Sequence, residues 1–142
     1  MSTLNITDSS SLLRALDGRS DDEILVALQG HYEQTCAQVF QGMKHAFLPE
    51  KAAGETAVIQ YEVKAPDAVH TYQVAVAAGK CEVSPGTAAP PRVTLKLALC
   101  DFLRLVSGRL NGVQAFFTGK LRVSGDMMLA QTMQGWFRRP TD

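Results

Sequence analysis

The sequence predicts an α+β fold in two layers, with helices packed on one mostly antiparallel sheet. Three observations lead to this prediction. The segment before residue 50 follows helical spacing, residues 56–97 alternate apolar and polar side chains in short segments, and the last third mixes short helices with a further alternating segment. At 142 residues the chain has the length of one domain, and it contains no internal repeat and no interdomain linker.

Two amphipathic helices open the pattern. Ser20 and the three acidic residues after it predict a helix start, because a serine hydroxyl and early carboxylates stabilise the amino end of a helix. Apolar residues at steps of three and four over residues 32–47 predict a second helix, which Pro49 and Gly54 end. We expect this helix pair to cover an apolar surface.

Four strands are predicted next, from side chains that alternate between apolar and polar. Residues 56–65 and 71–76 form the first two, and a Pro-Asp turn joins them into an antiparallel hairpin. Residues 80–84 form a short third strand. A loop with three prolines at 85–91 cannot be regular structure, and it leads to a fourth strand at 93–97.

Short helices and a fifth strand complete the last third. Asp101 is expected to cap a helix that ends at Gly108, and Asn111 is expected to cap another that contains the adjacent phenylalanines. Residues 120–124 alternate as a strand, and a Gly-Asp turn leads into a final helix at 127–137.

Composition and charge exclude several classes of protein. With 46% hydrophobic and 20% charged residues, the chain is typical of a folded globular domain. Equal numbers of basic and acidic residues, 14 of each, argue against a nucleic-acid binder. The sequence shows no run of about 18 apolar residues, no secretory signal and no terminal Ser-Lys-Leu address. We therefore expect a cytoplasmic protein.

The zero net charge hides an asymmetry along the chain. Residues 1–35 carry two basic and six acidic residues, whereas residues 92–142 carry eight basic and three acidic residues. Either the two ends attract each other across one compact fold, or the basic end forms a face that meets anionic lipid headgroups or an acidic partner. The sequence alone leaves both interpretations open.

Residues suited to catalysis or metal binding form no known constellation. Glycine-rich phosphate loops and the serine nucleophile elbow are absent. His31, His45 and His70 are spaced too widely for a metal-ligand pattern. Cys36 and His45 lie about two and a half helical turns apart and so face different ways. We predict no catalytic residue, no metal site and no cofactor, and we expect the three cysteines to be reduced core residues.

The predicted final helix is unusually apolar, beyond a single helical stripe. Its apolar residues are Met127, Met128, Leu129, Ala130, Met133, Trp136 and Phe137. Such a helix needs a second apolar contact besides the sheet, which a ligand, a partner or the rest of the core supplies. For the adjacent Phe116 and Phe117, we expect one ring in the core and the other in a second apolar space, which Phe102, Leu105 and Leu110 also line.

Residues 101–127 combine an acidic helix start, a Ser-Gly pair, a loop, Ala-Phe-Phe, a Gly-Lys-Leu strand and a Gly-Asp-Met helix start. In this order and spacing, the segment resembles the sterol carrier protein family in its type-two sterol-binding domain, as a stand-alone bacterial-type member. The resemblance is most specific over residues 92–137 and extends more weakly to 55–137. Residues 1–50 remain a helical lead-in to what we expect is a single lipid-binding domain, 1–142.

The resemblance implies a five-stranded, mostly antiparallel sheet that helices cover on one side, with an apolar tunnel between the layers. The residues that it places along this tunnel are Phe102, Leu105, Phe116, Phe117, Leu121, Met127, Met128 and Leu129. Helical spacing adds Trp136, which we expect at the mouth of the tunnel with its ring inside and its N–H near water.

We therefore predict a non-catalytic protein that binds and carries, or presents, an apolar lipid of the fatty acyl, sterol-like or prenyl-quinone-like kind. The expected partners are this lipid and, transiently, an anionic membrane surface or a lipid-using enzyme, with no nucleic acid. The alternative is a protein-interaction or accessory module whose apolar C-terminal helix packs on a partner or on a second copy. The identity of the lipid and the oligomeric state stay open.

Overall fold

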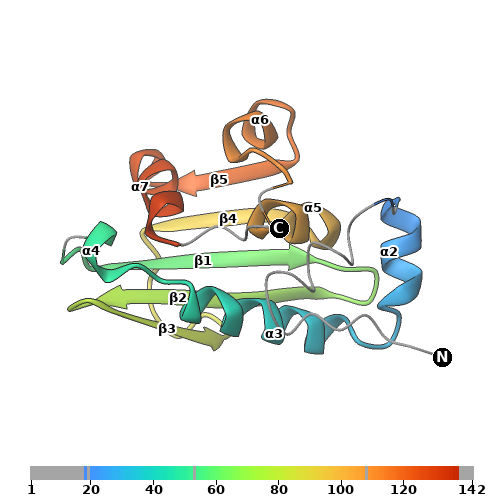
Figure 1. The fold of residues 1–142 in the computed structure, drawn as a ribbon, viewed down its shortest axis with the longest axis horizontal. Coiled ribbons are helices and arrows are strands. Elements are labelled where there is room, and N and C mark those ends of the chain that lie inside the picture. The colour runs from blue at the N-terminus through green and yellow to red at the C-terminus, as the bar shows by residue number, and fades with distance from the viewer. Residues whose placement is uncertain (1–17, 19, 53, 108, 138–142) are drawn as a thin grey trace.

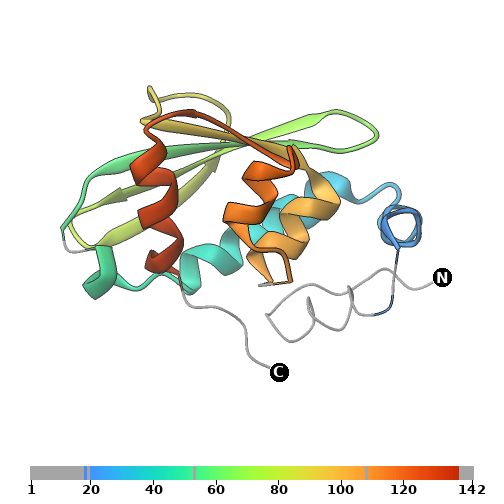
Figure 2. The same cartoon turned by 90° about the horizontal axis from the view of Figure 1, so that it is seen from above.

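The computed structural model describes residues 18, 20–52, 54–107 and 109–137, and it has the predicted α+β fold. One five-stranded sheet carries helices on one face (Figures 1 and 2). The strands are β1 (Ala57–Lys64), β2 (Val69–Ala77), β3 (Lys80–Pro85), β4 (Val93–Ala98) and β5 (Leu121–Gly125). The helices are α2 (Asp21–Ala27), α3 (Tyr32–His45), α4 (Pro49–Ala52), α5 (Leu99–Val106), α6 (Gly112–Phe117), α7 (Met127–Thr132) and the 3-10 helix η1 (Met133–Trp136).

The strands lie in the order β3-β2-β1-β4-β5. β1 and β4 are parallel and the other neighbours are antiparallel, so the sheet is mostly antiparallel as predicted. The predicted hairpin of β1 and β2 is confirmed, with Tyr61 opposite Tyr72. Because a parallel neighbour cannot be reached by a tight turn, the chain crosses the sheet between β3 and β4, and the proline-rich loop makes this crossing.

Two glutamines hold this loop on the face of the sheet that the helices leave free. Gln73 donates from its amide to the carbonyl oxygen of Ala89 at 2.6 Å and accepts from the N–H of Ala89 at 3.1 Å. The amide of Gln73 also donates to the side-chain oxygen of Gln60 at 3.0 Å. Both glutamines are buried, and these hydrogen bonds replace the water that they lose.

The apolar core fills the space between the sheet and the helices. Side chains alternate along each strand, so Ile59, Tyr61 and Val63 on β1 point into this space and are buried. On α3, Cys36 and Phe40 face them from the helical layer and are also buried. The buried apolar residues of the described chain form one continuous cluster.

Two predicted helix starts are confirmed by their caps. At the start of α2, Ser20 and Glu23 form a reciprocal capping box, with backbone-to-side-chain distances of 2.9 and 3.2 Å. At the start of α6, the side-chain oxygen of Asn111 accepts from the N–H groups of Val113 and Gln114. Both caps are local sequence signals, which is why they could be predicted.

Three predicted helix boundaries are wrong. Helix α3 ends at His45, and Pro49 opens α4 instead of ending α3, because proline suits the first position of a helix. Helix α5 begins at Leu99, where the extended backbone of β4 turns directly into a helix, so Asp101 lies inside the first turn and caps nothing. The final helix ends at Thr132 and tightens into η1, a common way for a helix to finish.

Gly125 joins β5 to α7 in a backbone conformation that suits only glycine. Its φ is +104°, and a Cβ there would lie 2.5 Å from the carbonyl oxygen of Arg92 and 3.2 Å from the Cα of Val93. Both obstacles are backbone atoms, one in the first residue of β4 and one in the residue before it, so neither can rotate away as a side chain would. The close pairing of β4 with β5 therefore depends on the missing side chain.

We expect Gly125→Ala to lower the free energy of unfolding by about 3 kcal/mol or more, because backbone strain and a backbone clash add. Gly119→Ala is the matched control, since φ is +80° but nothing lies within 4 Å of its Cβ. Strain alone should cost the control about 1–2 kcal/mol. Urea denaturation measures the free energy of unfolding of both variants. Equal losses of stability would show that the contact with the backbone at Arg92 and Val93 adds nothing to the strain.

Candidate functional site

Four aromatic rings join the helical layer to the sheet. Phe40 on α3 stacks on Tyr72 of β2, with 4.5 Å between ring centroids, and on Phe102 of α5, with 4.9 Å. Tyr61 of β1 meets the Phe40 ring edge-on at 5.3 Å. The cluster therefore fixes where α3 and α5 lie on the sheet. Sequence analysis selected only Phe102 among the four as a site residue, because ring contacts between distant segments leave no local pattern.

Five of the nine predicted site residues lie in the layer between the sheet and the helices. Phe102, Leu121, Leu129 and Trp136 are buried, and Leu105 is half-buried against the same core. Helix α5 contacts β1 and β4, and α7 contacts β4 and β5. These five residues therefore lie in the helical layer and on β5, with Phe102 packed toward β1 through Tyr61 and Leu129 on the helix that contacts β4 and β5.

The other four predicted site residues are exposed. The exposed fraction is 37% for Phe116, 79% for Phe117, 40% for Met127 and 77% for Met128. The expectation that one phenylalanine of the pair enters the core is wrong. The two rings instead contact each other at the surface, with 5.6 Å between centroids.

Helix α6 turns its phenylalanines outward because it packs through small residues. Gly112 and Ala115 are its buried residues. A Cβ on Gly112 would lie 2.6 Å from the side-chain amide of Gln134 in η1, which shows how closely α6 approaches η1. Both faces of α6 are apolar, one with large side chains and the other with small ones. The sequence pattern therefore does not indicate which face packs on the core.

Trp136 lies deeper than the sequence predicted. The residue is 2% exposed, so the expected placement of the indole N–H near water is wrong. Its carbonyl oxygen accepts from the N–H of Leu48 at 2.6 Å, which ties η1 to the chain that leads into α4. Next to this contact Phe47 forms an isolated β-bridge with Phe137, with 5.7 Å between their rings. The end of η1 is therefore held against the segment between α3 and α4.

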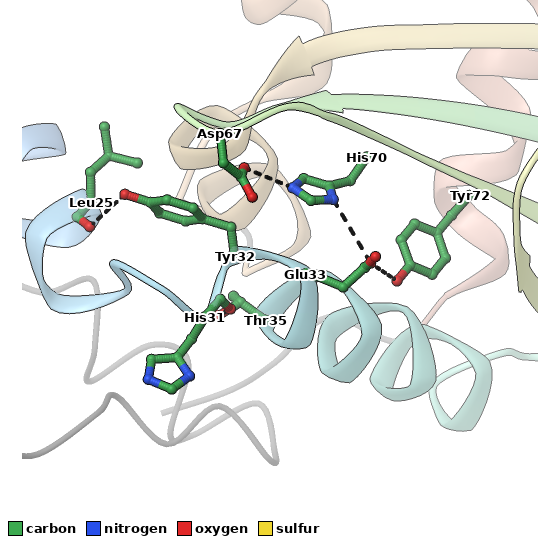
Figure 3. A network of polar contacts seen from close by, with 8 residues as sticks. All are labelled: Leu25, His31, Tyr32, Glu33, Thr35, Asp67, His70 and Tyr72. Carbon is green, nitrogen blue, oxygen red and sulfur yellow. Dashed lines mark hydrogen bonds and ion pairs between the residues drawn. The ribbon is translucent and has the colours of Figure 1, made fainter.

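A polar network lies beside the aromatic cluster (Figure 3). Glu33 on α3 accepts a hydrogen bond from the Tyr72 hydroxyl at 2.6 Å and lies 3.8 Å from Nδ1 of His70. Nε2 of His70 contacts a carboxylate oxygen of Asp67 at 3.0 Å. His70 is thus held between two carboxylates, and the network ties α3 to the β1–β2 hairpin.

The contacts of this network were not predicted from the sequence. Glu33 and Tyr72 are 39 residues apart, so nothing in the local pattern connects them. The only local signal is the three-residue spacing of Asp67 and His70 around the hairpin turn. Helix α3 is also tied back to α2, because the hydroxyl of Tyr32 donates to the carbonyl oxygen of Leu25 at 3.0 Å (Figure 3).

The network changes the acidity of its members. The hydrogen bond from His70 holds the pKa of Asp67 below its usual value. Burial and the hydrogen bond to Glu33 raise the pKa of Tyr72, so its hydroxyl stays protonated and donates. Because the pKa of Asp67 is lower in the folded than in the unfolded state, its stabilising effect is present above about pH 4 and is lost as the pH falls through the folded value.

Burial sets the chemistry of the cysteines. Cys36, Cys81 and Cys100 are free and buried, as expected. Desolvation raises the pKa of Cys36 to about 12 and that of Cys81 and Cys100 to about 11. Since a cysteine reacts as its thiolate, none of the three is poised as a nucleophile.

The charge asymmetry is partly neutralised inside the fold. Arg104 on α5 pairs with Asp21 on α2, which joins the basic last third to the acidic first third as the first interpretation predicts. Arg92 pairs with Asp126 at 3.0 Å and with Glu55 at 3.7 Å. Several cations of the last third remain exposed, so the second interpretation keeps a physical basis.

The described residues provide neither a metal-binding cluster nor a membrane-spanning helix. In that part of the chain, no group of three or more His, Cys, Asp or Glu residues is arranged to hold a metal ion. Among the same residues, no helix has the length and apolar character needed to cross a bilayer.

We expect His70→Ala to raise the pKa of Asp67, because the variant removes the hydrogen bond that favours the charged carboxylate. A pH titration of the carboxyl carbon signals by NMR measures this directly. Asp126 serves as the internal reference, since the N–H of Leu129 and the side chain of Arg92 lower its pKa independently of His70. If Asp67 titrates at the same pH in both proteins, the contact with His70 does not set its acidity.

We expect the three thiols to resist a disulfide reagent such as dithionitrobenzoate at about pH 8, because burial keeps them protonated. After unfolding in guanidinium, all three should react as fast as glutathione measured in the same buffer. A native thiol that reacts at the glutathione rate would contradict the burial of that cysteine.

Comparisons with known proteins agree with this architecture. Residues 38–138 match the SCP-2 sterol transfer family. Sterol carrier protein 2 of Homo sapiens is 39% identical over 70 residues, which are 49% of this chain and 13% of that protein. Peroxisomal multifunctional enzyme A of Dictyostelium discoideum is 28% identical over 128 residues, 89% of this chain and 26% of that protein.

A solved structure shares the fold. The crystal structure of sterol carrier protein 2 like 2 from Aedes aegypti superposes with a TM-score of 0.61 and 25% identity, covering 73% of this chain and 94% of that one. The family match begins inside α3, so it includes Phe40 and reaches further toward the amino terminus than the resemblance over 55–137. Since the match extends over more than half of the residues and the fold agrees, the chain belongs to the SCP-2 sterol transfer family.

Proposed function

We propose that this protein binds an apolar lipid between its sheet and its helices and carries or presents it without changing it chemically. The observation that carries the proposal is the match to the SCP-2 sterol transfer family over residues 38–138, which span the sheet and the helices on it. This match favours lipid binding over the alternative of a protein-interaction module. The protein acts as one lipid-binding domain, as the sequence predicted.

The ligand lies over the β4–β5 half of the sheet. The residues proposed to line it are the buried and half-buried members of the predicted site, which come from α5, β5, α7 and η1: Phe102, Leu105, Leu121, Leu129 and Trp136. All five side chains are apolar or aromatic, and Leu105 borders the surface. A molecule held there meets aliphatic and aromatic side chains, which suits a fatty acyl, sterol-like or prenyl-quinone-like ligand.

The energetics fit a ligand that is recognised by its apolar surface. Each buried CH₂ group contributes about 0.8 kcal/mol, so about ten of them match the roughly 8 kcal/mol of a micromolar complex. One methylene more or less changes the affinity by only a small factor, which makes binding tolerant of chain length. No polar anchor is needed for this affinity, and the proposed lining contains none.

The protein is proposed to act without catalysis and without a cofactor. The buried thiols are held protonated, and the network around His70 is occupied with joining α3 to the sheet. The human relative is far longer than the segment matched here, which is 13% of that protein. The cytoplasmic location stays a prediction, because one matched relative is named a peroxisomal protein.

Energy transfer from Trp136 to a dansyl-labelled fatty acid tests the proposal. Trp136 is the only tryptophan of the chain and is already buried, so binding should quench its emission in a saturable way with little shift in wavelength. We expect micromolar affinity for the delipidated protein. Native mass spectrometry before delipidation should show a co-purified lipid mass.

The matched variants are Leu105→Gln and Val26→Gln. Leu105 is half-buried in the proposed lining, whereas Val26 is 69% exposed on α2. A polar amide in the lining should weaken binding about tenfold or more, because it must be desolvated without a partner. Val26→Gln should bind as the parent does. Circular dichroism verifies folding, and a folded parent protein that leaves the dansyl lipid unbound would refute the proposed function.

A further inference from the structure

Exposed apolar side chains of the described chain are concentrated on the two helices that flank β5. Of the seven large apolar side chains that are exposed there, five lie on α6 and at the start of α7: Val113, Phe116, Phe117, Met127 and Met128. Figure 1 shows these helices at the two ends of the edge strand β5, and Figure 2 shows both on the helical side of the sheet.

Helix α6 carries the most complete apolar stripe. Val113, Phe116 and Phe117 follow the spacing of one helical face, and all three are exposed. The opposite face consists of the buried Gly112 and Ala115. The helix therefore keeps its large apolar side chains outside and its small ones inside, the reverse of an ordinary surface helix.

Only positive charges accompany this stripe along the chain. Residues 109–122 contain Arg109, Lys120 and Arg122 and no acidic residue. The nearest acids belong to other elements. Asp101 on α5 lies within electrostatic range of Lys120, and Asp126 is held by Arg92. Lys120 is exposed in the turn after α6. Arg122 is exposed on the edge strand, but it alternates with the core-facing Leu121 and Val123, so it extends from the face of the sheet that the helices leave free.

We propose that α6 and the turn into β5 dock onto an anionic lipid bilayer. The rings of Phe116 and Phe117 enter the headgroup region, while Lys120 contacts the anionic headgroups. This inference extends the proposed function, since a lipid carrier meets the membrane that supplies its ligand. Docking itself requires no bound ligand, so the two proposals fail separately.

The size of the stripe favours a bilayer over a protein partner. Two phenylalanines and a valine with these exposed fractions offer on the order of 200–300 Å² of apolar surface. A stable protein interface buries roughly 800 Å² on each partner. A small apolar stripe beside cations instead has the composition of a shallow interfacial anchor, in which charge brings the protein to the surface and apolar side chains hold it there.

Flotation of the delipidated protein with phospholipid vesicles tests the docking. Vesicles of phosphatidylcholine with added phosphatidylglycerol should bind the parent protein, and vesicles of phosphatidylcholine alone should bind it at least tenfold less. Raising the salt from about 0.1 to about 1 M should release the protein, because the screening length falls from about 10 to about 3 Å. Phe117→Ser should lower the affinity about tenfold and Lys120→Gln about fivefold, whereas Arg122→Gln, on the other face of the sheet, should bind as the parent does.

Matched variants separate the proposed surface from general stickiness. Val26→Ser removes an apolar side chain of similar exposure on α2, and Lys51→Gln removes an exposed cation on α4. Both should bind vesicles as the parent does. Docking by α6 is overturned if Phe117→Ser binds like the parent, or if the parent ignores the anionic lipid. Sedimentation that shows a dimer which Phe117→Ser dissociates would assign the stripe to a second copy instead.

Discussion

The ring of Tyr72 is the point at which the helical layer is fastened to the sheet. Phe40 stacks on its face and Glu33 accepts from its hydroxyl, and both partners come from α3. Glu33 and Phe40 are seven residues apart, about two helical turns, so one face of α3 supplies both contacts. An apolar contact and a charged hydrogen bond on the same side chain fix the distance and the rotation of α3 together. Phe102 on α5 also stacks on Phe40, so the same ring positions α5.

The two halves of the sheet are covered in different ways. Over β1, β2 and β3, α3 is held by stacked rings, by the Glu33–His70–Asp67 network and by an ion pair of Lys44 with Glu82 at 3.2 Å. Over β4 and β5, α6 and α7 pack through small and aliphatic residues such as Ala115 and Leu129. Apolar contacts without hydrogen-bonded anchors separate and re-form at lower cost than a satisfied polar network. Under the proposed function, the ligand therefore enters over the β4–β5 half, where the Arg92–Asp126 ion pair is a polar contact that holds the start of α7.

The sequence predicted the features that have a local signal and missed those that depend on contacts between distant segments. All five strands were predicted, because alternation of side chains is a local signal of a half-buried strand. The caps by Ser20 and Asn111 were predicted for the same reason. Asp101 was misassigned because β4 runs straight into α5, and the outward turn of Phe116 and Phe117 was missed because Gln134 contacts α6 from another element. The Glu33–Tyr72 contact has no local signature at all.

The exposed α6 and the proposed ligand layer share the strand β5. Leu121 on this strand faces the buried layer, whereas α6 at the start of β5 keeps Phe116 and Phe117 outside. A protein docked through α6 therefore holds the less firmly anchored half of its fold against the bilayer. An apolar ligand leaving the membrane at that point avoids bulk water over most of its path, and each methylene kept out of water is worth about 0.8 kcal/mol. The small residues that let α6 approach η1 thus explain why the large side chains of α6 lie outside.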